Sequence, residues 1–216
     1  MWSSDLPQLS SAQAKQVDAL VEERFGIPID WLMEAAGWQV ARLIEGRAVV
    51  VCGVGNNAGD GFAAARHLQR WGRLARVCCV DAERVRGAAA LELAALRHTG
   101  AEVSGELSLE GAEVVVDAIF GTGLSRAPGG RFAEWIEAIN AAGKRVIAID
   151  VPSGLDADTG VAYSPAVHPD LTVALGLPKP GLTGEVAVVD IGIPLQAYAA
   201  VGVEVRPELF GSRIRL

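Results

Sequence analysis

Three clusters of polar residues follow apolar segments of the chain, and their side chains are the ones that could do chemistry. In chain order they contribute Asn56, Asn57, Asp60, Asp117, Asp150 and Ser153. Amide, carboxylate and hydroxyl oxygens suit a hard cation rather than zinc, and no histidine or cysteine joins them. A buried carboxylate such as Asp117 must be paired, hydrated or bound to a cation. The alternative is that Asp117 only accepts hydrogen bonds from the backbone of a turn.

The first cluster, GVGNNAGDG, also matches a dinucleotide-binding fingerprint. Gly53, Gly55 and Ala58 fit the pattern G-x-G-x-x-A, which lies between a strand and a helix. We expect the helix to run from Asp60 to Trp71, with free N–H groups at its start that could bind phosphate. The glycines would let the backbone turn tightly and approach a ligand. Asp81, after the next strand, could then lie near a ribose hydroxyl. The alternative is a tight turn without a ligand.

Apolar segments that alternate with amphipathic ones position these clusters. After a first strand in the apolar run that begins at Ala48, we predict strands at 75–80, 113–120, 145–150, 171–174 and 185–189, and helices at 85–99 and 131–142. Ser10 and Gln13 resemble a capping box at the start of a helix, and another helix follows Asp30. This alternation predicts an α/β fold with a parallel sheet covered on both faces. The polar clusters would then meet at the carboxyl edge of the sheet, where such folds bind ligands.

Composition and charge exclude several classes of protein. A net charge of -7 argues against a nucleic-acid surface, which draws on clustered lysine and arginine. No apolar run approaches the ~20 residues of a transmembrane helix, so no membrane partner is expected. The N-terminal residues do not resemble a secretory signal. Cys52, Cys78 and Cys79 lie inside apolar runs and form no disulfide framework, so we expect a cytoplasmic, reducing location.

Longer motifs resemble the NAD(P)H-hydrate epimerase family over nearly the whole chain. In order they are LMEAAG, GNNAGDG, DAIFGTGLSR, DVPSGLDADTG, LPKPGL and VDIGIP. The resemblance implies one domain over residues 1–216. Its fold would be a three-layer α/β/α Rossmann-like sandwich with a mostly parallel sheet and an N-terminal extension of two helices. The chain departs from the family at Ala35, where asparagine is usual, and at Ala58, where glycine is usual.

The resemblance also implies a set of site residues. The substrate would contact Asn56, Asn57, Ala58, Gly59, Asp60, Gly121, Thr122, Gly123, Leu124, Ser125, Arg126, Ala127 and Asp150. One potassium ion (K+) per subunit would be held by Asn57, Asp117 and Ser153.

The implied reaction is repair of a damaged cofactor, in which the R and S forms of hydrated NADH or NADPH (NADHX and NADPHX) are interconverted. The hydrated ring carbon is a carbinolamine, so loss of its hydroxyl gives an iminium ion, and water can return to the other face. Asp150 is the expected acid–base residue and would also place negative charge near the ring. Lys179, which lies between two prolines, would anchor a phosphate or act as a proton partner, unless it is only a flexible surface charge.

The expected partners follow from the same resemblance. A hydrate dehydratase that uses ADP or ATP would act on the same metabolite, as a separate protein or as a further domain if this chain is a fragment. A homodimer is expected, with Trp31 and Trp38 of the N-terminal helices on a plausible dimer surface. The preference between NADHX and NADPHX stays open.

Two other functions fit parts of the sequence. One is an NAD(P)-dependent oxidoreductase that uses the G-x-G-x-x-A turn, which would need a second domain for its substrate. The other is a non-catalytic domain of the same fold that binds a nucleotide or a protein partner. Intact Asn57, Asp117, Asp150 and Ser153 argue against decay of a catalytic site.

Overall fold

Short apolar segments form a central parallel sheet in the computed structural model, which describes residues 6–211. Over these residues the strands are β1 (Ala48–Cys52), β2 (Leu74–Cys79), β3 (Val103–Ser104), β4 (Val114–Ala118), β5 (Arg145–Ile149), β6 (Leu171–Leu175) and β7 (Val186–Val189). The helices are α1 (Ser11–Phe25), α2 (Ile29–Leu43), α3 (Asn56–Arg70), the short 3-10 helix η1 (Ala82–Arg84), α4 (Ala88–His98), α5 (Arg131–Ala141), α6 (Leu195–Ala200) and α7 (Glu208–Gly211). The predicted α/β class is confirmed.

The order of the strands determines where a ligand site can form. Across the described sheet the order is β3-β2-β1-β4-β5-β6-β7, and every neighbouring pair is parallel. The chain runs outward from β1 to β3 and then returns to the other side of β1 as β4. The loops after β1 and β4 therefore leave the sheet in opposite directions, and a crevice opens between them at the carboxyl edge.

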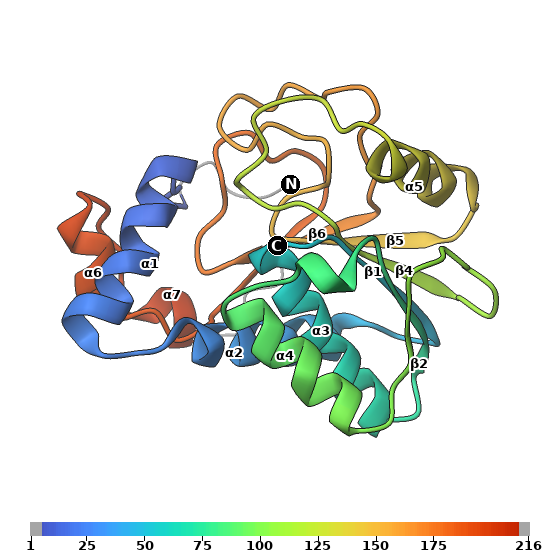
Figure 1. Cartoon of the computed structure of the whole chain (residues 1–216). Coiled ribbons are helices and arrows are strands. Elements are labelled where there is room, and N and C mark those ends of the chain that lie inside the picture. Colours follow the sequence, from blue (N-terminus) through green and yellow to red (C-terminus); the bar gives the residue numbers. More distant parts are fainter. Residues whose placement is uncertain (1–5, 212–216) are drawn as a thin grey trace.

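Helices cover both faces of the sheet, as Figure 1 shows. On one face α2, α3 and α4 pack together over a large apolar core that includes Val50, Phe62 and Leu96. On the other face α5 packs on a smaller core around Val115 and Ile136. The N-terminal helix α1 packs against α6 and α2 at one end of the molecule. No helix in residues 6–211 combines the length and the apolar character needed to cross a membrane.

Local signals explain how the helices begin and how closely they pack. The Ser10 side chain accepts a hydrogen bond from the backbone of Gln13, and the Gln13 side chain returns one to Ser10, so the predicted capping box is present. Gly37 of α2 lies so close to α3 that an added Cβ would be 2.4 Å from the Cβ of Ala63. This glycine lets α2 approach the helix that begins at the ligand edge.

Some predicted boundaries were wrong. We expected α3 to begin at Asp60, but it begins at Asn56, directly after β1 and a three-residue turn. Asparagine and glycine are poor helix formers, so their run suggests a turn. Packing overrides that preference, because Ala58 is fully buried and Gly61 lies against Cys52 and Ala118. The sequence reading also missed β3, α6 and α7, which are short and carry little periodic signal.

The junction between β1 and α3 yields a prediction about two glycines. A Cβ on Gly53 would lie 2.1 Å from the backbone oxygen of Ile119, whereas a Cβ on Gly55 would meet nothing within 4 Å. Gly53→Ala should therefore lower the free energy of unfolding by ~1–3 kcal/mol, measured by denaturant titration. The matched variant Gly55→Ala should change it by less than about 0.5 kcal/mol. An equal decrease in the free energy of unfolding of the two variants would contradict this account of the junction.

Candidate active site

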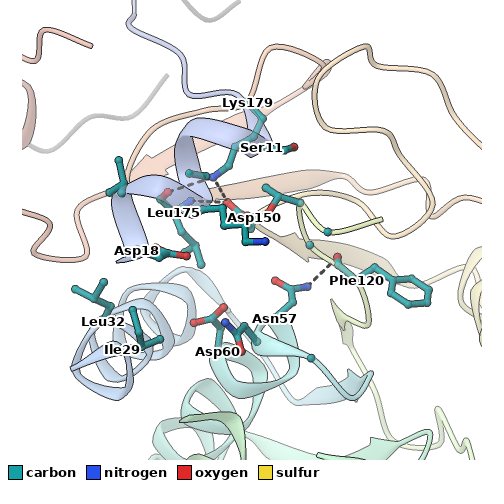
Figure 2. A pocket seen from close by; sticks show the side chains of 18 of the residues that line it. Ser11, Asp18, Ile29, Leu32, Asn57, Asp60, Phe120, Asp150, Leu175 and Lys179 are labelled. Carbon is teal, nitrogen blue, oxygen red and sulfur yellow. Dashed lines mark hydrogen bonds and ion pairs between the residues drawn. The ribbon is translucent and has the colours of Figure 1, made fainter. Parts of the chain in front are cut away.

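A pocket of about 770 Å³ opens at the carboxyl edge of the sheet, in the crevice between the loops after β1 and β4. Its volume lies in the range of typical small-molecule sites. Residues of α1, α2 and α3 form part of its wall, together with Asp150, Leu175 and Lys179 near the ends of β5 and β6. Figure 2 shows these side chains around a common space.

The start of α3 forms one side of the pocket. Gly55, Asn56, Asn57 and Asp60 all line it. Gly55 is the N-cap residue, and no side chain caps the helix there. The first N–H groups of a helix have no partner within the helix and attract negative charge. This junction can therefore bind a phosphate or another anionic group of a ligand.

Asn57, Phe120 and Ser153 connect three loops in one hydrogen-bond network. The Asn57 side-chain amide donates to the Phe120 carbonyl oxygen at 3.0 Å. The Phe120 backbone N–H donates to Ser153 Oγ at 2.8 Å. The loops that follow β1, β4 and β5 are thus held to one another beneath the pocket, so their positions depend on the same few bonds.

Asp117 lies at the base of this network and is fully buried. Its Oδ1 accepts hydrogen bonds from Ser153 Oγ at 2.6 Å and from the Ile119 N–H at 3.1 Å, and its Oδ2 accepts one from the Ser153 N–H at 2.8 Å. Burial raises the pKa of Asp117 to about 6, although these hydrogen bonds favour the charged form. Within residues 6–211 no cationic side chain forms an ion pair with Asp117.

Asp150 occupies a strained position directly after β5. Its φ is 63°, a left-handed value that residues other than glycine rarely adopt, and the Val151 N–H donates across it to the Ile149 carbonyl at 2.7 Å. This three-residue turn with positive φ is a rare and strained form. Such strain costs about 1–3 kcal/mol and is found mainly at functional sites. The turn directs the carboxylate of Asp150 into the pocket, as Figure 2 shows.

Lys179 fixes the orientation of that carboxylate. Its side chain is only 4% exposed, and its Nζ lies 2.5 Å from Asp150 Oδ1. It also donates to the carbonyl oxygens of Leu175 at 3.4 Å and Leu177 at 3.3 Å. An ammonium group has three N–H donors, and all three have acceptors inside the protein. Lys179 is therefore not a flexible surface charge, and this geometry suits it to holding Asp150 in place.

Two further carboxyl groups, Asp60 and Asp18, line the same pocket. Asp60 is 8% exposed, and burial raises its pKa well above the ordinary value, with the negative charge of Asp150 adding to the shift. Asp18 extends from α1 at the edge of the cavity, where loss of hydration raises its pKa and the positive charge of Lys179 opposes the rise. The pocket therefore holds three carboxyl groups beside Lys15 and Lys179, and the raised pKa values favour the neutral forms of Asp60 and Asp18.

Asn57, Asp117 and Ser153 also fit a monovalent cation. Asn57 Oδ1 is buried and has no hydrogen-bond partner among residues 6–211, so this oxygen can accept a ligand. Beside it the network supplies carboxylate, hydroxyl and carbonyl oxygens, the donors that hard cations prefer. In the described part of the chain no cluster of three or more histidine, cysteine, aspartate or glutamate residues could hold a metal, so a site of that other type is not found.

The structure brings only part of the expected substrate-contact set to the pocket. The residues of that set that line it are Asn56, Asn57, Asp60, Gly121, Thr122, Gly123, Leu124 and Asp150. Ala58 is buried in the core and helical, and Gly59 packs on Met33 and Ala89. The exposed residues 125–127 lie outside the lining. Gly53 approaches the Ile119 carbonyl rather than a ligand.

The expected position of Asp81 near a ribose has no support in this geometry. Asp81 follows β2 and caps η1, and it is not part of the pocket lining. The pocket instead extends toward α1 and α2, on which Asp18, Leu32 and Met33 line it. Sequence reasoning missed this wall. The helical spacing marks Val17 and Val21 as core positions, but nothing in it marks their neighbour Asp18 as part of a site.

Comparisons with known proteins agree with this architecture. The family model described as "YjeF-related protein N-terminus" matches residues 29–181. A crystal structure of yeast ynu0, YNL200c, superposes with a TM-score of 0.80 at 26% identity, covering 97% of this chain and 99% of that one.

Curated relatives cover the chain at higher identity. The NAD(P)H-hydrate epimerase of Rhodopirellula baltica is 36% identical, over 88% of this chain and 86% of the relative. The NAD(P)H-hydrate epimerase of Levilactobacillus brevis is 37% identical, over 87% of this chain and 95% of the relative. The bifunctional NAD(P)H-hydrate repair enzyme Nnr of Thermofilum pendens is 41% identical over 85% of this chain, which spans only 40% of that relative. The chain belongs to the YjeF-related N-terminal family, and the relatives that it resembles over most of its length include NAD(P)H-hydrate epimerases.

Proposed function

We propose that this chain is an isomerase that interconverts the R and S forms of hydrated NADH and NADPH. The observation that carries the proposal is Asp150, a carboxylate held by a strained turn and by Lys179 against a pocket at the sheet switch point. The reaction needs an acid–base group and negative charge beside a ring that becomes cationic. The names of the relatives that match over most of the chain support the same activity.

The chemistry follows from the structure of the hydrated ring. The ring nitrogen donates its lone pair as the C–O bond of the neighbouring carbinolamine breaks, and the departing hydroxyl takes a proton to leave as water. The resulting iminium ion is planar, so water can add to either face. Asp150 stabilises this cation and moves a proton to or from oxygen. A positioned group of this kind typically contributes ~10²–10⁴-fold, and fixed charges in a pocket lower the barrier further.

A potassium ion would be held by Asn57, Asp117 and Ser153. It would supply a positive charge next to the buried Asp117 carboxylate and help to fix the loops after β1, β4 and β5. The unpartnered Asn57 Oδ1 supports this assignment. Ser153 Oγ accepts a hydrogen bond from the Phe120 N–H and donates one to Asp117, which also accepts one from the Ser153 N–H. These bonds hold the base of the pocket in place.

The two other functions have less support. An oxidoreductase that used the G-x-G-x-x-A turn would need Asp81 near its ligand, and Asp81 does not line the pocket. A domain that only binds nucleotides would gain nothing from a strained carboxylate such as Asp150. We therefore favour the epimerase.

The same proposal extends to partners and location. A hydrate dehydratase that uses ADP or ATP would consume one epimer, because relatives such as that of Thermofilum pendens are named as bifunctional repair enzymes. The proposed homodimer would form through the face of α2 that carries Trp31, which is 64% exposed. Trp38 contributes less to this face, because it packs against His67 and Trp71 of the same chain. Three free, buried cysteines agree with a cytoplasmic location.

The first test follows a single epimer of NADHX or NADPHX and its partner by chromatography. Wild-type protein should interconvert the two far faster than the spontaneous reaction. Asp150→Asn should slow the interconversion by at least about 10²-fold, since it removes the positioned proton-transfer group, while binding of the substrate is largely retained. Asp81→Asn is the matched control and should leave the rate unchanged. No acceleration by the wild-type protein would refute the function, and an unchanged rate in Asp150→Asn would remove Asp150 from the mechanism.

The second test uses the pKa of Asp117 to detect the cation. The ordinary pKa is 3.8 and the folded value is about 6, so the cation-free folded protein binds this proton more tightly than the unfolded chain. The contribution of Asp117 to the free energy of unfolding therefore falls as pH rises from about 4 to about 6. A bound K+ would offset that loss only where Asp117 is ionised.

Added K+ should thus raise the melting temperature more at about pH 8 than at about pH 5, measured by calorimetry in tetramethylammonium buffers. Asp117→Ala should lose both this shift and any dependence of the activity on K+. A K+ effect of the same size at both pH values, or one that survives in Asp117→Ala, would show that the cation binds elsewhere.

A further inference from the structure

We propose that Asp60 is a second catalytic carboxyl group, which serves one face of the reacting ring while Asp150 serves the other. This inference rests on the proposed function and deepens it, because it assigns the residue that makes inversion possible. It starts from the placement of two carboxyl groups in one pocket on different elements, Asp60 on α3 and Asp150 after β5.

Asp60 has the properties expected of a side chain that binds a ligand. It is 8% exposed and lines the pocket. Within the described residues its carboxyl group forms no hydrogen bond and no ion pair. A buried polar group without a partner lowers stability, so it is expected to have a partner when the protein acts.

The two carboxyl groups face the cavity from opposite sides. Figure 2 shows Asp60 extending from the start of α3 and Asp150 approaching from the side of Leu175 and Lys179, and both line the same pocket. Lys179 bonds to Asp150 Oδ1 and has no donor left for Asp60. A planar ring bound in that space would therefore present one face to each carboxyl group.

Inversion at the hydrated carbon requires chemistry on both faces. Asp60 donates a proton to the hydroxyl on its own side, the C–O bond breaks to release water, and the nitrogen lone pair forms the C=N bond of the iminium ion. A water molecule on the side of Asp150 then forms the new C–O bond and gives its proton to that carboxylate. The substrate is inverted, one proton has moved from Asp60 to Asp150, and exchange with solvent or the reverse reaction resets the pair.

The environment of Asp60 agrees with the role of proton donor. Burial raises its pKa, and the charges of Asp150, Asp18 and Glu92 raise it further, while Lys179 opposes the rise. These effects favour the neutral form, which carries the proton that a general acid donates.

The test separates exchange of the hydroxyl oxygen from inversion, using each pure epimer of NADHX in ¹⁸O-labelled water. Wild-type protein should incorporate the label and invert both epimers. In Asp60→Asn inversion should fall by on the order of 10²-fold, but one epimer should still exchange its hydroxyl without inversion, through Asp150 on its own face. Asp150→Asn should retain exchange in the opposite epimer. Each variant should thus retain oxygen exchange in the epimer for which the other variant loses it.

Controls keep the outcomes distinct. Asp18→Asn removes a carboxyl group from the same pocket but leaves Asp60 and Asp150 on the two faces of the ring. Any decrease in rate should therefore be the same for oxygen exchange and for inversion. Asp60→Asn should keep or raise the melting temperature, because the carboxyl group that it removes has no hydrogen-bond or ion-pair partner in the part of the chain that the structure describes. If wild-type protein does not interconvert the epimers, the proposed function fails. If it does, but Asp60→Asn inverts at the wild-type rate or loses exchange of both epimers alike, the role of Asp60 is refuted.

Discussion

The bond between the buried carboxylate of Asp117 and Ser153 is the interaction on which the rest of the site depends. Asp117 lies next to the last residue of the central strand β4 and is fully buried, yet its partners are a hydroxyl group and two backbone N–H groups rather than a cation. A buried carboxylate with only neutral partners costs free energy. That cost explains why a bound cation is expected here. The same bonds tie the loop after β4 to the loop after β5, so a charge at the base of the pocket also sets the shape of its walls.

Above this base the site contains carboxyl groups in different environments. Asp150 is held by Lys179 on a strained turn, whereas Asp60 forms no hydrogen bond or ion pair with any residue between 6 and 211. Two carboxyl groups whose environments differ in this way are suited to different roles in one acid–base reaction. A carboxylate beside the ring would stabilise positive charge that develops there more than it stabilises the neutral ring, and only such a difference accelerates a reaction. The α/β sheet provides the rigid edge that keeps these groups apart.

Much of this arrangement could be predicted because parallel strands bring their carboxyl ends to one edge. Asp117, Asp150 and Asn57 were recognised because each follows an apolar strand, and the sheet order places their loops side by side. Other features depend on tertiary contacts that no local pattern contains. The role of Gly53 comes from the carbonyl of Ile119 in another loop, and the early start of α3 comes from packing of small residues on the sheet. Asp18 joins the pocket only because α1 folds back beside it.

The central claim is that the base of the pocket is built around one monovalent cation. The most direct measurement is a crystal structure of the protein grown with thallium(I), which replaces K+ and scatters anomalously. The account predicts one strong anomalous peak per chain, in contact with Asn57 Oδ1 and next to Asp117 and Ser153. A map with no peak there, and with Asn57 Oδ1 bonded to a protein group or a water molecule instead, would contradict it.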